Sequence, residues 1–494
     1  MSLGESIRSG AKWLILGKLG NRLLEFAFGV ALARLLTPTD FGLVATVAVF
    51  TGFVGMFTAG GMGQSLIRAK EADEDDFTAV LTLQLAMGLI VYAGFFLAAP
   101  YIAHFFGDPI YTDLVRVAAL TFLLRPFFVM RNAWLTRRMD FKSRTMVSVA
   151  SGLLTGVTAT ALAWSGFGVW SLVLSGLFTA IVQNVWLARL APVRARLNPD
   201  FSIMRKHSGF GAKIVMNDFV TYLRTESKSL ILSKLAGPSF LGLFNKAESL
   251  SRLPNQLLMS PTMEPLFRAM SKTQDDLDQT RYMLYRTITL LTVYTTPLYV
   301  LLWWIAEPFI ALVYGEKWIA AGEPMSILSA AGVFLNLIFP CSVVLAAQNR
   351  LGQEIYAQSL NLVIVIAVCI FGLNWGLAGV AWGIVLSQAL LAVHLYWLSQ
   401  RLLGTRIGDL ASALMPGLGL SGLLFLALLL IDHLIGGPSH LPHAAYLLIM
   451  SGSGGLFYLA AFLLIPIPSL RSEAARWQQK LTYGIALINK AARP

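Results

Sequence analysis

Long apolar runs recur along the whole chain, and short polar connections separate them. A helix needs about 20 residues to cross the hydrocarbon core of a membrane, whereas a membrane strand needs about ten and alternates polar with apolar positions. These runs are long and do not alternate, so the pattern predicts an all-α integral membrane protein with about fourteen transmembrane helices. The runs lie at residues 13–36, 41–63, 79–100, 111–131, 146–165, 168–188, 209–235, 240–263, 283–306, 320–347, 354–373, 377–399, 410–431 and 444–466.

Composition agrees with this interpretation. Of the 494 residues, 56% are hydrophobic and 13% are charged, whereas a soluble domain has about 25% charged residues. This balance excludes an ordinary soluble enzyme, a disordered chain and a disulfide-rich secreted domain. The net charge of +12 is explained by topology rather than by nucleic acid, because lysine and arginine accumulate in cytoplasmic loops.

The distribution of basic residues predicts the orientation. With the N-terminus in the cytoplasm, the cytoplasmic connections and tails hold 26 of the 38 lysines and arginines, counting those at span ends. The outer connections hold only Lys317. The positive-inside rule therefore places both termini in the cytoplasm and favours an even number of spans.

Two segments of the chain repeat. Ala33 to Leu43 resembles Ser233 to Leu243, and Trp170 to Leu190 resembles Trp382 to Leu402. We therefore expect two tandem six-helix lobes related by a pseudo-twofold axis along the membrane normal, with a site between them. The expected parts are residues 1–200, residues 201–405, a helix pair at 406–467 and a cytoplasmic amphipathic tail at 468–494.

The first, seventh and eighth apolar runs contain polar stripes at helical spacing. A charged group at the centre of a bilayer costs roughly 2.5–3.5 kcal/mol even on insertion scales, so such stripes are expected to face each other or water. The first run has one stripe, Lys18, Asn21, Arg22 and Glu25, and the eighth has one, Asn245, Ser249, Arg252 and Gln256. The seventh has a basic stripe, Lys213, Asn217, Arg224 and Lys228, and beside it a polar one, Asp218, Tyr222, Thr225 and Ser229.

Salt bridges within the stripes are one explanation for these charges, for example between Arg22 and Glu25. The three runs nevertheless hold nine basic residues (Lys18, Arg22, Arg34, Lys213, Arg224, Lys228, Lys234, Lys246 and Arg252) against four acidic ones (Glu25, Asp218, Glu226 and Glu248). A cationic excess at depth is typical of a water-filled cavity that receives an anion, and arginine binds phosphate or carboxylate through two hydrogen bonds.

No signal for catalysis, a cofactor or a metal accompanies the stripes. The sequence has no phosphate-binding glycine loop and no nucleophile elbow, and its six histidines show no metal-ligand spacing. We therefore expect a transporter without a cofactor that does not hydrolyse ATP.

Several motifs resemble one transporter family. They are the end of the first run with its turn, Ala31 to Leu43, and the stretches Phe105 to Gly107, Arg137 to Lys142, Gly166 to Trp170, Leu241 to Phe244 and Gly315 to Trp318. The chain resembles, over roughly residues 5–465, the Wzx-type oligosaccharide flippases of the polysaccharide-transporter family, and most of all their colanic-acid-type branch. This family belongs to the multidrug/oligosaccharidyl-lipid/polysaccharide flippase superfamily.

The resemblance implies translocation of an undecaprenyl-diphosphate-linked oligosaccharide from the cytoplasmic to the periplasmic leaflet of a bacterial inner membrane, for lipopolysaccharide or exopolysaccharide synthesis. It implies alternating access through a central cavity lined by the first, second, seventh and eighth spans, and a lipid groove at the last two. The resemblance also implies possible coupling to protons or sodium, and possible association with a polysaccharide polymerase and export proteins.

The candidate residues follow from the stripes and the resemblance together. We expect Arg22, Arg224 and Arg252 to bind the diphosphate or an acidic sugar, and Lys18 and Lys228 to attract it. The remaining candidates are Glu25, Asn21, Asn217, Asn245 and Gln256 for binding, and Glu25, Glu226 and Asp218 for coupling. A cation-coupled multidrug exporter of the same superfamily, or a membrane-embedded polysaccharide polymerase or ligase, remains an alternative.

Overall fold

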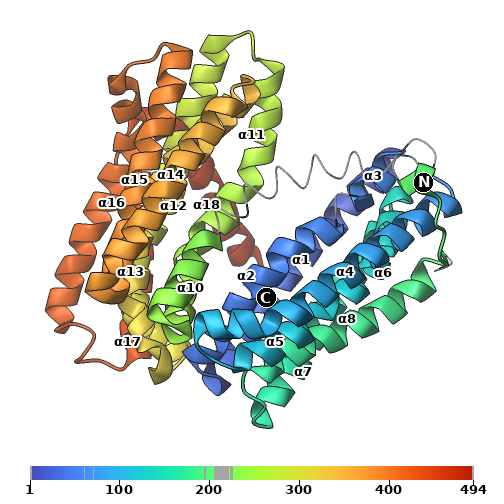
Figure 1. Ribbon diagram of the computed structural model, residues 1–494. Helices are drawn as coiled ribbons and strands as arrows, with labels where there is room; N and C mark the ends of the chain where they lie inside the picture. The colour runs from blue at the N-terminus through green and yellow to red at the C-terminus, as the bar shows by residue number, and fades with distance from the viewer. Residues whose placement is uncertain are drawn as a thin grey trace. The chain divides into compact units, whose positions relative to one another are not determined.

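The computed structural model describes residues 3–59, 62–69, 72–193, 196–204, 222 and 226–491. All regular structure within these residues is helical, and none of them forms a strand. The chain divides into two compact units, Met1–Gly242 (unit 1) and Leu243–Pro494 (unit 2), and each is considered by itself (Figure 1).

Unit 1 is helical, and most of its consecutive helices are joined by short connections. Its helices are α1 (Leu3–Leu35), α2 (Pro38–Ala59), α3 (Met62–Arg68), α4 (Glu74–Phe106), α5 (Ile110–Ala119), α6 (Thr121–Arg137), α7 (Phe141–Trp164) and α8 (Trp170–Leu190), followed by a helical stretch at 226–236 and the first residues of α10.

Unit 2 has the same all-helical character. It contains most of α10 (Pro238–Ser251), the π-helix η1 (Asn255–Met259), α11 (Ser260–Lys272), α12 (Leu277–Val313), η2 (Glu316–Ala321), α13 (Gly322–Ala347), α14 (Leu351–Gly372), η3 (Leu373–Trp375), α15 (Gly376–Leu403), α16 (Ile407–Ile435), α17 (His443–Leu464), η4 (Pro468–Leu470) and α18 (Arg471–Ala491).

Eight helical stretches in the described part of the chain are long and apolar enough to cross a membrane. The prediction of an all-helical, multi-span protein is therefore confirmed, while the count of fourteen spans and the twofold relation of two lobes stay predictions. The fourth apolar run is divided at Leu120 into α5 and α6. Pro126 lies inside α6 and lacks the N–H that would donate an intrahelical hydrogen bond. A straight helix is therefore less stable in this segment.

The eighth apolar run also departs from a regular helix. α10 ends at Ser251, and the chain continues into the five-residue π-helix η1. Pro254 lacks the N–H that would continue the α-helical ladder, so the backbone widens there instead. The irregular segment begins beside Arg252, one of the candidate binding residues.

Helices α1 and α7 pack closely because α7 presents small residues. Leu32 and Leu36 share a buried cluster with Ala159 and Ala163 of α7. A β-carbon added at Gly156 would lie 2.0 Å from the Phe28 ring, so only glycine fits there. Within a membrane such close van der Waals packing, rather than exclusion of water, holds helices together.

The turn between α1 and α2 is held by hydrogen bonds between Thr37 and Asp40. The backbone N–H and the hydroxyl of Thr37 both donate to the Asp40 carboxylate, at 2.9 and 2.7 Å. The Asp40 N–H in turn donates to the Thr37 hydroxyl at 3.3 Å. This reciprocal cap satisfies N–H groups that α2 itself cannot.

Just beyond this turn, α2 meets the start of α10 within unit 1. A β-carbon at Gly42 would lie 1.7 Å from the Pro238 carbonyl oxygen, and one at Gly242 would lie 2.0 Å from the Pro38 carbonyl oxygen. The two glycines, 200 positions apart in the repeat, thus make reciprocal close contacts with the two prolines.

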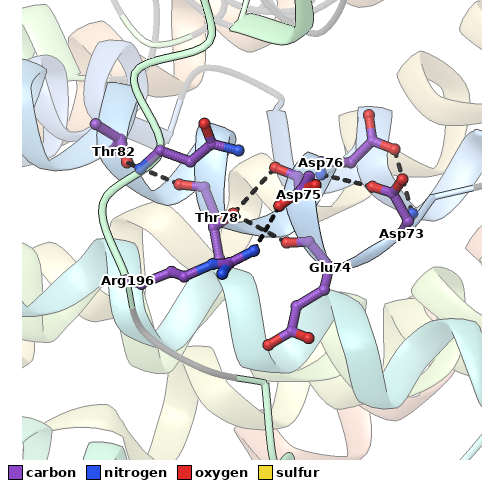
Figure 2. Close-up of polar contacts among 8 residues, drawn as sticks. Asp73, Glu74, Asp75, Asp76, Thr78, Thr82 and Arg196 are labelled. Atoms are coloured by element: carbon purple, nitrogen blue, oxygen red, sulfur yellow. Dashed lines mark hydrogen bonds and ion pairs between the residues drawn. The ribbon is translucent and has the colours of Figure 1, made fainter.

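An acidic turn fixes the start of α4, as Figure 2 shows. Asp73 accepts from the Asp76 N–H at 2.9 Å, and Asp76 accepts from the Asp73 N–H at 3.2 Å. Carboxylates at a helix N-terminus also interact favourably with the helix dipole. Arg196, in the segment that follows α8, pairs with Asp75 at 2.7 Å and thereby anchors that segment to α4.

The amphipathic tail forms α18 and packs on unit 2. Arg286 of α12 donates to the Glu473 carboxylate at 2.9 Å and to the Ser469 carbonyl at 2.7 Å. The side chains of Arg286 and Glu473 are only 24% and 14% exposed, so the tail is held by a largely buried ion pair.

Candidate functional site

The polar stripe of α1 is preserved in the structure but separates into two pairs of residues. The Arg22 guanidinium donates to the Glu25 carboxylate at 3.1 Å, and these side chains are 61% and 65% exposed. An ion pair that is this exposed to solvent contributes little to the stability of the protein. Both groups therefore stay accessible, and Arg22 can exchange its contact with Glu25 for a ligand anion.

Lys18 and Asn21 line a cavity of about 230 Å³ inside unit 1. The Asn21 amide donates to the Ser148 hydroxyl of α7 at 2.8 Å, which fixes its position. Lys18 is exposed and makes no hydrogen bond or ion pair with any residue in the described part of the chain.

The stripe predicted in the eighth run lies on the open face of α10 and η1. Asn245, Ser249, Arg252 and Gln256 are exposed or half-buried, whereas Phe244, Ala247 and Leu250 on the other face are buried. The helical spacing of the sequence therefore identified one accessible polar face of unit 2.

Arg252 does not stand alone on this face. Its guanidinium donates to the Glu248 carboxylate at 2.6 Å, and the Glu248 side chain is only 11% exposed while that of Arg252 is 48% exposed. The largely buried carboxylate orients the Arg252 guanidinium. Because one carboxylate cannot bond all five guanidinium N–H groups, some of them remain available to a ligand.

Most of the seventh-run stripe lies outside the described residues. This applies to Lys213, Asn217, Asp218 and Arg224, so their roles stay predictions. Glu226 and Lys228 are described and half-buried, near the start of the helical stretch at 226–236. The structure brings Lys18 together with Asn21, Arg22 with Glu25, and Arg252 with Glu248.

An apolar groove of about 240 Å³ lies in unit 2 between α12, α16, α17 and α18. Leu298, Leu301 and Leu459 contribute to its walls, and Trp477 of the tail contacts one end. The Trp477 indole N–H donates to the Tyr294 hydroxyl at 3.0 Å, which fixes the ring beside the groove.

The analysis of the sequence alone missed several residues at these places. Arg144, Asn132 and Gln183 line the cavity with Lys18, but none of the three was among the candidate residues. Trp477 was recognised as part of an amphipathic tail and not as a groove residue. Among the described residues, no group of three or more metal-ligating side chains comes together.

Comparison with known proteins assigns the chain to a family. Residues 31–323 match the family model described as polysaccharide biosynthesis protein. The succinoglycan biosynthesis transport protein ExoT of Rhizobium meliloti is 26% identical over 71% of this chain and 70% of its own. The lipopolysaccharide biosynthesis protein WzxC of Escherichia coli is 24% identical over 80% of this chain and 81% of its own.

Solved structures confirm the fold. The lipid II flippase MurJ in its inward closed conformation aligns with a TM-score of 0.71 at 15% identity, covering 90% of this chain and 97% of MurJ. An inward-facing multidrug resistance MATE family transporter aligns with a TM-score of 0.60 at 14% identity, covering 78% of this chain and 94% of that one. The predicted recognition is confirmed: this chain belongs to the polysaccharide biosynthesis protein family, with the fold of the multidrug/oligosaccharidyl-lipid/polysaccharide flippase superfamily.

Proposed function

We propose that this transporter, which is not an enzyme, flips an undecaprenyl-diphosphate-linked oligosaccharide from the cytoplasmic to the periplasmic leaflet of a bacterial inner membrane. The family and the transport proteins within it support this class of function. The observation that favours an anionic lipid-linked substrate most is the accessible cationic stripe on α1 and α10, where Arg22 and Arg252 are each exposed.

In this proposal the lobes 1–200 and 201–405 rock against each other to give alternating access. Arg22, Arg224 and Arg252 bind the diphosphate or an acidic sugar, and Lys18 and Lys228 attract it from either side. Each arginine–phosphate contact is a charge-assisted hydrogen bond worth roughly 1.5–3 kcal/mol. Glu25, Glu226 and Asp218 hold the cations between transport cycles, or exchange a coupling proton.

The apolar groove of unit 2 suits the lipid anchor of such a substrate. Its wall is almost entirely hydrocarbon and aromatic, lined by residues of α12, α16 and α17. Within a membrane a prenyl chain is held by close van der Waals contact with such a wall rather than by exclusion of water, so the groove can accept the chain while the sugar stays in the polar part.

A transport assay tests the proposal directly. Proteoliposomes receive a fluorescent prenyl-diphosphate oligosaccharide, and a membrane-impermeant quencher reports the fraction that has crossed. We expect Arg252→Ala and Arg22→Ala to abolish crossing when equal amounts of folded protein are reconstituted, and Arg→Lys to restore it only partly, because lysine lacks the planar fork.

Arg34→Ala is the matched control, because Arg34 lies in the last turn of α1, away from the accessible stripe. It should leave transport largely intact. The alternative of a multidrug exporter predicts that a lipophilic cation competes for transport, and unimpaired flipping by the Arg22, Arg224 and Arg252 triple alanine variant would contradict the anion cavity.

A further inference from the structure

The cavity inside unit 1 has an unusual chemical composition. It lies between α1, α6, α7 and α8 and includes Lys18, Asn132, Arg144, Gln183 and Ser148 in its lining. Two of its lining side chains are cations and none is a carboxylate. Its volume of about 230 Å³ equals roughly eight waters at about 30 Å³ each, which is ample for a phosphate group.

Arg144 is held in position by a neighbour that leaves most of its donors available. Its Nε donates to the Asn132 side-chain oxygen at 3.0 Å. In the described part of the chain, nothing bonds the two terminal guanidinium nitrogens, which are the pair that binds phosphate through two hydrogen bonds. The amide therefore orients the guanidinium without neutralising it.

The walls of the cavity are tied together. The Thr145 hydroxyl donates to the Trp13 carbonyl at 3.3 Å, and Asn21 bonds Ser148 at 2.8 Å, so α1 and α7 are linked on both sides of Lys18. A ligand that enters meets donors that are already placed, which lowers the entropy cost of binding.

The acidic residue nearest to Arg144 in the sequence is already engaged. Asp140 precedes α7 and accepts from the Ser143 N–H at 3.0 Å, as the N-terminal cap of that helix. It is not among the residues that line the cavity. Arg144 lies in the first turn of α7, where the helix dipole adds positive potential. The electrostatics of the cavity consequently disfavour sodium or an organic cation and favour an oxyanion.

We propose that this cavity is a phosphate-binding subsite that receives the phosphate oxyanion of a membrane lipid, with Arg144 and Lys18 as its cationic ligands and Asn132 as the positioning residue. It rests on the proposed function, in which the anion is the diphosphate of the lipid-linked substrate. The cavity lies where α6 ends and α7 begins, and the basic residues of that connection predict a cytoplasmic position, so the subsite would load substrate from the cytoplasmic leaflet.

The test places a reporter in the cavity of the full-length protein. Gln183→Cys supplies a thiol among the lining residues, and the native Cys341 and Cys369 are buried and give little background. The rate of maleimide labelling is measured with undecaprenyl diphosphate, phosphatidylglycerol or sodium chloride added. We expect undecaprenyl diphosphate to slow the labelling at least fivefold and sodium chloride to leave it unchanged.

Adding Arg144→Gln to the reporter should raise the concentration of undecaprenyl diphosphate needed for protection by about 10- to 150-fold, the loss expected for one hydrogen bond to a charged group. Arg138→Gln is the matched control, because Arg138 lies in the same connection but stacks on the Trp134 ring at 3.8 Å and does not line the cavity. It should not change the protection.

Two further arms identify the source of the phosphate and separate this proposal from the proposed function. Protection by phosphatidylglycerol at equal concentration supports a phosphate site and assigns it to the phospholipid headgroup. Absence of protection by either lipid, or protection that survives Arg144→Gln, overturns the subsite. In that case transport by the wild-type protein in the flipping assay still upholds the proposed function, whereas absence of transport refutes it independently.

Discussion

The reciprocal contacts of Gly42 and Gly242 allow a sharp prediction about stability. In Gly42→Ala, the new methyl group would lie 1.7 Å from the Pro238 carbonyl oxygen, whereas ordinary van der Waals contact begins at 3.4 Å. The two backbones must therefore separate by about 1.7 Å, because neither atom belongs to a side chain that can rotate away.

This separation also breaks a buried hydrogen bond. The hydroxyls of Thr46 and Ser233 lie 2.6 Å apart, and both residues are buried. A rigid shift of the size required would carry them beyond hydrogen-bond range. Overpacking costs roughly 1–3 kcal/mol and the lost bond about 1 kcal/mol, so we expect a destabilisation of about 2–4 kcal/mol. At about 2.1 cal/mol/K per residue, a chain of 494 residues has an unfolding entropy of roughly 1 kcal/mol/K, so this corresponds to a fall in melting temperature of about 2–4 °C.

Thermal unfolding of the purified protein in detergent measures the effect. Gly29→Ala is the matched control, since a β-carbon there meets nothing within 4 Å and alanine favours a helix over glycine. Because Gly42→Ala and Gly242→Ala strain the same contact, the double variant should lose less than the sum of the single losses. An unchanged melting temperature in Gly42→Ala, or strictly additive losses, would refute the close contact.

Three further predictions follow from the structure. In spheroplasts, Lys317→Cys and Ser439→Cys, both at exposed positions, should react with an impermeant thiol reagent while Arg138→Cys should not, and the opposite result would invert the topology. Glu473→Gln should break the ion pair between α18 and Arg286, which should lower the free energy of unfolding by roughly 1.5–3 kcal/mol. Tryptic cleavage after Arg476 and Lys480 should then be faster, and an unchanged cleavage rate would show that the pair does not hold the tail. Arg252→Ala should destabilise the protein by removing the ion pair with the largely buried Glu248 carboxylate, and adding Glu248→Gln should restore part of the melting temperature but not transport; recovered transport would make Arg252 structural.

The sequence predicted the helical membrane fold and the accessible polar faces of α1 and α10, because both depend on periodicities that a single helix imposes. It could not predict that Thr46 is a buried contact to Ser233, since the two residues are far apart in the chain. It likewise did not identify Arg144 as a candidate, because only tertiary packing places this residue beside Lys18. Pro254 was visible in the sequence, but the choice of a π-helix over a simple break depends on neighbouring packing.

The fold alone leaves the substrate undecided, because a lipid II flippase and a multidrug transporter both align with this chain. Charge separates the two classes. At about 4 Å and an effective dielectric constant of about 20, one like charge costs a bound cation about 4 kcal/mol, and Lys18 and Arg144 present two such charges in the cavity of unit 1. The whole binding free energy of a ligand with a dissociation constant of about 1 mM is about 4 kcal/mol, so a monovalent cation cannot overcome this repulsion. On the role proposed for this cavity an anion gains what the cation loses, so we expect the same two side chains to disfavour a cationic drug and to favour a lipid-linked phosphate.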